Sequence, residues 1–316
     1  MTTTKKNLHE FSVDELTDAY GDKRVSPVEA TEAALARVDA HNEAVNAFVV
    51  FDPETARDMA RDSESRWTAG APLGPLDGVP TTLKDTMYAK GWPTLRGSRT
   101  SDTEGPWDVD APPVARLREA GAVFLGKTTT PEFGWKGITD SDLSGITRNP
   151  WNTGRTTGGS SGGAVAAAAL GMGVVHTGSD AGGSVRIPAS FTGVFALKPT
   201  YGRVPVWPAS AFGTLSHIGP ITRTVSDAAI MLNVMAQPDA RDWTSLPQDG
   251  TDYLDGLDGG IEGLRVAFSP TLGFADNVDP EIAGLVRAAA DAVEALGATV
   301  EEVDPDIAEA PEVFRT

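Results

Sequence analysis

The chain has 316 residues, of which 40% are hydrophobic and 22% charged, a composition typical of a globular protein with a hydrophobic core. Its formal net charge is −18 without any cluster of lysine and arginine, so we expect no nucleic-acid partner and interpret the acidity as a solvated surface. It contains no cysteine, which excludes disulfide bonds, thiolate metal sites and a cysteine nucleophile.

The N-terminal residues, MTTTKKNLHEFSVDEL, contain neither an apolar h-region nor a small-residue cleavage pattern. No run of about eighteen apolar residues occurs anywhere in the sequence, so no membrane-spanning helix is expected. These features predict a cytoplasmic protein without a membrane partner.

Helix signals dominate the first part of the chain. Ser26-Pro27-Val28-Glu29 is a capping box with proline at the first helical position, and it predicts a helix over 26–42. Asp52-Pro53 repeats the start signal and predicts a second helix over 54–67.

Helices and strands alternate in the remainder of the chain. The sequence predicts helices over 112–121, 163–173 and 279–297, and strands over 122–125, 264–269 and 298–303. The helix over 163–173 consists of small residues, so it can pack very close to a sheet. This alternation is typical of an α/β fold in which helices cover a mixed sheet.

We expect two parts in the chain, a helical segment over 1–65 that packs on the core and an α/β domain over 66–316. Within the second part, residues 141–220 are rich in glycine, proline, serine and threonine and are expected to form a long loop-like region. Aromatic residues in this region argue against disorder, so we interpret it as functional.

Two short motifs match known sites without the required context. Residues 121–128 match the phosphate-loop pattern GxxxxGK(S/T), but a helix precedes them and TTTPEF is a poor helix start. Residues 158–162 match the nucleophile elbow GxSxG, also in the frame shifted by one residue, but NPWNTGRTT before them does not predict a strand. A histidine-based triad through His217 stays open as a minor alternative, and His176 and His217 are otherwise interpreted as structural. No HExxH motif occurs, so we expect no metal.

Three stretches together contain the residues needed for a serine nucleophile that is activated without histidine. They are GVPTTLKD at 78–85, GGSSGG at 158–163 and GSDAGGSVRIP at 178–188. A serine hydroxyl is a weak nucleophile that needs a base, and Lys84 can be that base if burial lowers its pKa and keeps the amine neutral. The residues alone leave open which serine is the nucleophile, and the candidates are Ser160, Ser161, Ser179 and Ser184.

The glycines before Ser184 predict an anion site. Without side chains, the N–H groups of Gly182 and Gly183 can turn toward one point and hold a developing oxyanion. Asp180 and Arg186 can pair across this turn and hold its shape.

GGSSGG followed by GSDAGGSVRIPA, with LKD upstream, resembles the amidase signature family. The likeness covers residues 76–232 strongly and the N-terminal part more loosely. It implies an α/β fold with a mixed, twisted sheet between layers of helices. It also implies hydrolysis of amide C–N bonds through an acyl-enzyme, without a cofactor.

The resemblance implies a Ser–cisSer–Lys triad, with Ser184 as the nucleophile, Ser160 as the bridging serine and Lys84 as the base. It implies an oxyanion hole formed by the backbone amides of Ala181, Gly182, Gly183 and Ser184. The residues expected to support the site are Ser161, Ser179, Asp180 and Arg186. Those expected to bind substrate are Gly134, Trp135, Ile187 and Phe191, and their apolar character favours aryl or alkyl amides.

Other activities share this triad, and carbamate or ester hydrolysis needs the same residues. The amidase subunit of a tRNA-dependent amidotransferase ranks lower, because residues 186–189 read RIPA where that subunit more often has RQPA. A non-catalytic subunit ranks lower because the triad residues are intact. The family core is longer than this chain, so we expect the C-terminal part of the family domain to be absent from it. We expect a small-molecule amide or carbamate substrate, and we allow for a homodimer.

Overall fold

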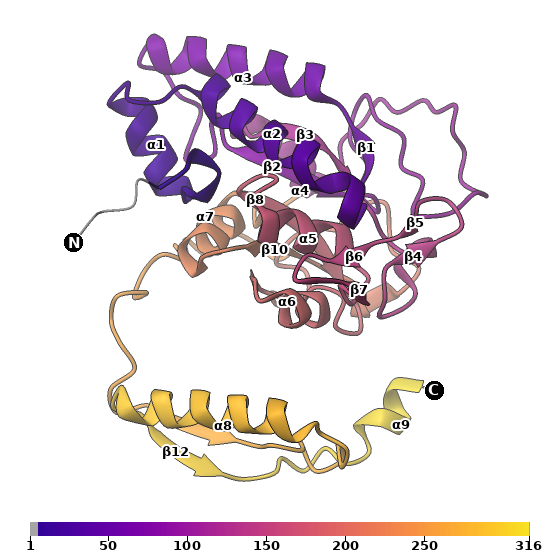
Figure 1. Cartoon of the computed structure of the whole chain (residues 1–316), viewed down its shortest axis with the longest axis vertical. Coiled ribbons are helices and arrows are strands. Elements are labelled where there is room, and N and C mark those ends of the chain that lie inside the picture. Colours follow the sequence, from indigo (N-terminus) through magenta and orange to yellow (C-terminus); the bar gives the residue numbers. More distant parts are fainter. Residues whose placement is uncertain (1–5, 316) are drawn as a thin grey trace. The chain divides into compact units, whose positions relative to one another are not determined.

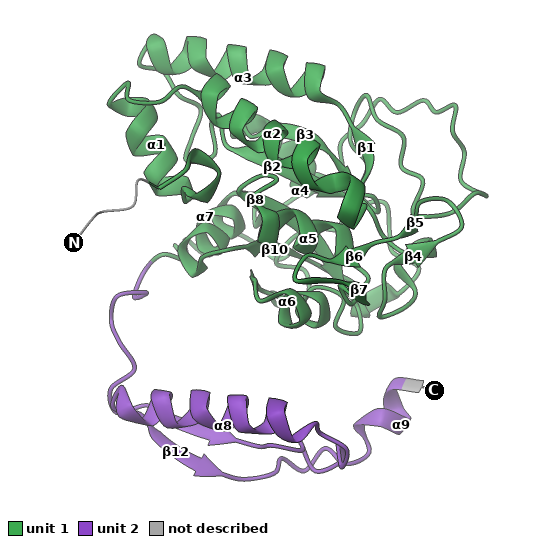
Figure 2. Cartoon of the chain, viewed as in Figure 1, with its two compact units in different colours: residues 1–254 green, residues 255–316 purple. Residues whose placement is uncertain are grey.

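The computed structural model describes residues 6–315 and divides the chain into two compact units, residues 1–254 and residues 255–316 (Figure 2). The expected boundary at residue 65 falls inside the first unit, within helix α3 (Pro53–Thr68), and it stays a prediction.

Four helical segments open the first unit: η1 (Leu8–Glu10), α1 (Val13–Gly21), α2 (Pro27–Val45) and α3 (Figure 1). The capping box at the start of α2 is confirmed, since the hydroxyl of Ser26 accepts from the N–H of Glu29 and the carboxylate of Glu29 accepts from the N–H of Ser26. The second start signal is also confirmed, since the carboxylate of Asp52 caps α3.

A six-stranded mixed sheet forms the centre of this unit, in the order β1 (Phe48–Phe51), β3 (Val123–Thr128), β2 (Pro80–Lys84), β8 (Val175–Asp180), β10 (His217–Thr222) and β9 (Phe195–Ala196). Strand β2 runs parallel to both of its neighbours, whereas the other pairs are antiparallel. The carboxyl ends of β2 and β8 therefore meet at one edge of the sheet, where Lys84 and Asp180 are the last strand residues.

Helices cover both faces of the sheet. Val123 and Leu125 belong to a buried cluster with α2, α3 and α5 (Gly162–Leu170), whereas Phe124 belongs to a cluster with α1, α4 (Pro112–Glu119) and α7 (Val225–Met235). Successive side chains of a strand point to opposite faces, so these two clusters lie on opposite sides of the sheet. The predicted α/β fold, with a mixed sheet between helical layers, is confirmed.

The small-residue helix α5 packs against the sheet as its sequence predicts. A Cβ atom at Gly163 would collide with the carbonyl oxygen of Ala47, and one at Gly162 would collide with the hydroxyl groups of Thr139 and Thr157. Glycine at these two positions lets the start of α5 approach the neighbouring backbone closely.

The expectation of a long loop over 141–220 is wrong. This region supplies two inner strands of the sheet, β8 and β10, together with α5, α6 (Arg186–Thr192) and a hairpin of β6 (Arg148–Asn149) and β7 (Asn152–Thr156). Strand β8 reads VHTGSD, which has no apolar alternation, but it lies between two partner strands and its polar groups are bonded inside the core. Tertiary pairing here overrides the local composition.

Short elements form the remaining connections of the first unit: η2 (Glu132–Gly134), η3 (Gly213–Leu215), and the paired strands β4 (Asp140–Ser141) and β5 (Gly145–Ile146).

The second unit is a βαβ arrangement, as its sequence predicts. Strands β11 (Arg265–Phe268) and β12 (Thr299–Glu302) are parallel, α8 (Pro280–Ala295) connects them, and α9 (Ala310–Arg315) follows. Across the described residues of both units, no helix has the length and apolar character needed to cross a membrane.

Candidate active site

Lys84 is the last residue of β2, and its side chain is completely buried. Its amine nitrogen lies 2.7 Å from Ser160 Oγ, 2.9 Å from Ser161 Oγ and 3.0 Å from Ser179 Oγ. The structure therefore brings three of the predicted serines around the predicted base.

Burial lowers the pKa of Lys84 to about 7, while the nearby carboxylate of Asp180 opposes this shift. An amine with this pKa is substantially neutral near pH 7, and a neutral amine has a lone pair that can accept a proton. A lysine that acts as a base must be buried and neutral, and the end of β2 supplies that environment.

The glycine-serine stretch folds into a close-packed turn at the start of α5. The peptide bond between Gly159 and Ser160 is cis, and Gly158 has a positive φ of 73°. A Cβ atom at Gly159 would lie 2.6 Å from the backbone of Ile138, so only glycine fits there. The turn is fixed to the next serine loop, because the N–H of Ser161 donates to the carbonyl oxygen of Ser184 at 3.1 Å.

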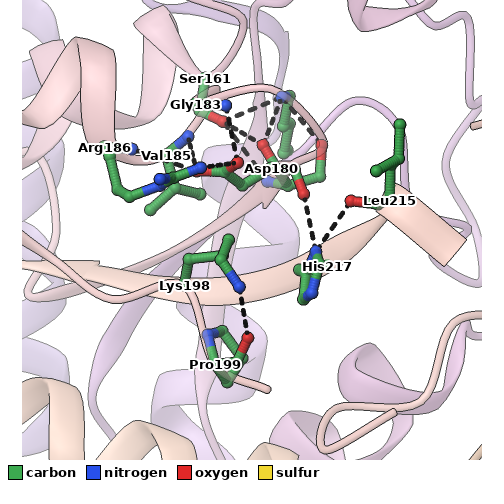
Figure 3. A network of polar contacts seen from close by, with 11 residues as sticks. Ser161, Asp180, Gly183, Val185, Arg186, Lys198, Pro199, Leu215 and His217 are labelled. Atoms are coloured by element: carbon green, nitrogen blue, oxygen red, sulfur yellow. Dashed lines mark hydrogen bonds and ion pairs between the residues drawn. The ribbon is translucent and has the colours of Figure 1, made fainter. Parts of the chain in front are cut away.

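The loop between β8 and α6 is organised by one carboxylate. Asp180 accepts hydrogen bonds from the N–H groups of Gly183 (2.8 Å) and Val185 (3.2 Å), and from the guanidinium of Arg186 at 2.9 Å (Figure 3). Burial by itself would raise the pKa of Asp180, but these hydrogen bonds lower it to about 2. The ionised carboxylate thus holds the backbone on which Ser184 sits.

This network changes the expected oxyanion hole. The N–H of Gly183 donates to Asp180, so this donor is already occupied in this structure. The N–H groups of Ala181, Gly182 and Ser184 make no hydrogen bond to any described residue. Three of the four expected donors are therefore available.

A cavity of about 350 Å³ opens beside this loop. Ser160 and Ser184 both line it, and Ser184 Oγ makes no hydrogen bond within residues 6–315. Residues 206–212, with the sequence VWPASAF, form another part of the lining, together with Met87 and Phe133. This wall was not predicted, because its only signal in the sequence is two aromatic residues in an apolar, proline-containing stretch.

The four expected substrate-binding residues take different positions. Gly134 lines the cavity. Trp135 is outside the lining and 78% exposed, but it stacks on Phe212, which is part of the lining, with ring centroids 5.8 Å apart. Ile187 and Phe191 lie on α6 outside the lining and close to the backbone of Gly158.

His217 contacts backbone carbonyl oxygens, as expected of a structural histidine. It pairs with Asp180 across β8 and β10, and its Nδ1 lies 2.8 Å from the carbonyl oxygen of Leu215 and 3.2 Å from that of Asp180 (Figure 3). Both partners are acceptors, so Nδ1 carries the hydrogen. No serine hydroxyl among the described residues bonds to this ring, so the histidine-based triad has no geometric support.

The two rejected motifs are explained by the structure. Lys127 of the phosphate-loop match lies inside β3, completely buried, and pairs with Asp85 at 2.8 Å. No strand was expected before the residues that match the nucleophile elbow. This expectation is wrong, since β7 ends at Thr156. That strand belongs to a two-stranded hairpin outside the central sheet, unlike the strand that an elbow requires.

Comparisons with known proteins show the family of the chain. A family model described as Amidase matches residues 29–313. An acylamidase of Rhodococcus erythropolis is 45% identical over 303 residues, which are 96% of this chain and 63% of that protein. A glutamyl-tRNA(Gln) amidotransferase subunit of Methylococcus capsulatus is 42% identical over 94% of this chain and 61% of its own length.

Solved structures show the same likeness. A bacterial aryl acylamidase of the amidase signature enzymes matches with a TM-score of 0.84 and 34% identity, over 94% of this chain and 61% of that chain. A 6-aminohexanoate cyclic dimer hydrolase in complex with substrate matches with a TM-score of 0.83 and 36% identity, over 94% and 61%. The chain thus spans less than two thirds of the length of these relatives.

Proposed function

The chain belongs to the amidase signature family, and from that premise we propose that it is a serine hydrolase that cleaves the C–N bond of small amides through an acyl-enzyme. The observation that carries this proposal is the contact between the buried amine of Lys84 and the hydroxyl of Ser160, beside a cavity that Ser184 lines. Two similar proteins support amides as the substrate class: the relative named as an acylamidase and the solved structure of an aryl acylamidase.

In the proposed mechanism, Ser160 gives its proton to neutral Lys84 while it accepts the proton of Ser184. The Ser184 oxygen attacks the substrate carbonyl, and the oxyanion is held by the free N–H groups of residues 181, 182 and 184. The protonated Lys84 then returns a proton through Ser160 to the leaving amine, and the C–N bond breaks. Water hydrolyses the ester at Ser184 by the same relay, which regenerates both serine hydroxyls and releases the carboxylic acid.

The test is a panel of anilides, aliphatic amides, esters and carbamates assayed with the chain and with its Ser184→Ala and Lys84→Ala variants. We expect hydrolysis of at least one amide, lost in both variants while circular dichroism and the melting temperature show an intact fold. Full activity in Ser184→Ala would reject the mechanism. A preference for carbamates or esters over amides would place the enzyme among urethane or ester hydrolases with the same triad.

A second role is considered because several relatives at 40–42% identity are subunits of glutamyl-tRNA(Gln) amidotransferases. Such a subunit would release ammonia from glutamine, a small polar amide, whereas the cavity wall at 206–212 carries the aromatic side chains of Trp207 and Phe212. We therefore rank this role second. Glutamine hydrolysis faster than anilide hydrolysis would reverse the order.

We further propose that the protein acts in the cytoplasm on a small molecule and that any assembly is a homodimer. Fractionation of the source cells and light scattering of the purified protein test these two statements.

A further inference from the structure

Arg96 is the only basic residue among those that line the catalytic cavity, within the part of the chain that the structure describes. The other charged residue of the lining, Asp180, is neutralised by its ion pair with Arg186. The guanidinium of Arg96 has no hydrogen bond and no ion pair with any residue from 6 to 315. A chain with a net charge of −18 therefore keeps an unpaired positive charge at the cavity that its proposed nucleophile also lines.

The backbone fixes Arg96 relative to the site. Its N–H donates to the carbonyl oxygen of Asp85, the residue that follows Lys84, at 3.1 Å. Its carbonyl oxygen accepts from the N–H of Phe133, another residue of the lining, at 2.7 Å. Arg96 also has a φ of 53°, a left-handed conformation that residues with side chains seldom adopt and that favours glycine. A strained arginine at a functional cavity is a reason to look for a role of its side chain.

The side chain is held by an aromatic neighbour. The guanidinium lies 5.4 Å from the ring centroid of Tyr88, and the Tyr88 ring packs edge-on against Trp207 of the cavity wall. A cation–π contact is made with the charge of the guanidinium and does not pair its N–H groups with an acceptor. Five rigid donors then stay available for an acceptor in the cavity.

We propose that Arg96 binds a carboxylate of the substrate, so that the preferred substrates are aryl or alkyl amides with a free carboxylate in either the acyl or the amine part. This inference rests on the proposed amidase function and names its substrate class. A planar guanidinium matches a carboxylate with two parallel hydrogen bonds, and this charge-assisted pair is stronger than a bond to a neutral amide. Arg96 is thus a specificity-determining residue.

Binding to the Ser184→Ala variant tests the proposal without any hydrolysis. Calorimetry compares two matched pairs: N-phenylsuccinamic acid with its carboxamide, and 4-acetamidobenzoate with 4-acetamidobenzamide. We expect at least one carboxylate to bind about 10–100-fold tighter than its neutral partner, with a difference that shrinks as salt is added. Adding Arg96→Gln should bring the two dissociation constants of that pair within about twofold of each other.

Two further variants separate recognition from folding. Arg99→Gln alters an exposed arginine of the same loop that is outside the cavity lining, and it should leave the preference unchanged. Arg96→Gly suits the positive φ, so it should keep the melting temperature and still lose the preference. Equal affinity for both members of both pairs, or a carboxylate preference that survives Arg96→Gln, would overturn the inference. Neither result would affect the proposed function, which is tested separately by hydrolysis of neutral amides.

Discussion

The amine nitrogen of Lys84 lies 2.7 Å from the hydroxyl oxygen of Ser160, and both side chains are buried. Burial keeps this amine substantially neutral near pH 7, and the short distance gives it one hydroxyl whose proton it can take. The chemistry of the site follows from this pair, because Ser160 connects the buried base to the cavity that Ser184 also lines.

The rate should depend on the protonation of Lys84. The neutral amine is the active form, so kcat/KM is expected to rise about tenfold per pH unit well below the lysine pKa of about 7 and to level off above about pH 8. A pH–rate profile measures this. A profile that is flat from pH 5.5 to 8 would contradict the role of Lys84 as base.

Burial of the same lysine should also affect folding. Its folded pKa is about 7 and its ordinary pKa is 10.5, so between these values the unfolded chain binds more protons and stability rises with pH. Lys84→Met removes the titrating group. The unfolding free energy of this variant should therefore not rise with pH in this way, and the variant should be inactive. Urea unfolding at pH 7 and pH 9 measures both chains, and an equal pH dependence in the two would refute the burial argument.

The two neighbouring serines should differ in their importance. Ser160 and Ser161 both contact Lys84, but only Ser160 lines the cavity. Ser160→Ala should therefore lower kcat by about 10²–10⁴-fold, whereas Ser161→Ala should cost less than about tenfold. Steady-state kinetics on one amide compares the two variants. A larger loss in Ser161→Ala would exchange their roles.

Asp180 should influence the base as well as the loop. Its negative charge raises the pKa of Lys84, so Asp180→Asn should shift the acid limb of the pH–rate profile to lower pH. The variant also loses the ion pair with Arg186, and the free amides of the loop become less ordered, so kcat should fall by about 10²-fold. A lower rate without any shift of the acid limb would mean that Asp180 acts only through the loop.

His217 should tune one oxyanion donor. The carbonyl oxygen of Asp180 that accepts from His217 belongs to the same peptide unit as the N–H of Ala181, and a hydrogen bond to the carbonyl orients that unit and polarises its N–H. His217→Phe should lower kcat by about 3–10-fold with little change in KM. This loss is smaller than the loss in kcat expected when a whole oxyanion donor is removed. His217→Asn, which retains a donor near Nδ1, should recover part of the rate. An unchanged kcat in His217→Phe would remove this role.

Helices α2 and α3 and their starts could be predicted from the sequence because their signals are local, whereas α6 and α7 were not predicted. Ser26 and Asp52 cap the helices that their spacing predicts, and the βαβ pattern of the second unit is readable from its periodicity. Strand β8 could not be predicted, since its residues enter the core only through pairing with β2 and β10.

The residues of the site also fall into those that can be recognised in the sequence and those that cannot. Ser160 and Ser184 stand next to glycines and Lys84 ends a short apolar run, and a sequence displays these patterns directly. Other features depend on the folded backbone: the N–H of Gly183 is occupied by Asp180, and Arg96 reaches the cavity from a loop without any motif. Such contacts join residues far apart in the chain, so no local pattern encodes them.

The most direct test of the central claim is reaction with a serine-directed fluorophosphonate followed by peptide mass mapping. We predict a single adduct on Ser184, formed faster as the pH rises through about 7 and absent in Ser184→Ala and Lys84→Ala. An adduct on Ser160 or Ser161, or unchanged labelling of Ser184 in Lys84→Ala, would contradict a nucleophile activated by the buried lysine.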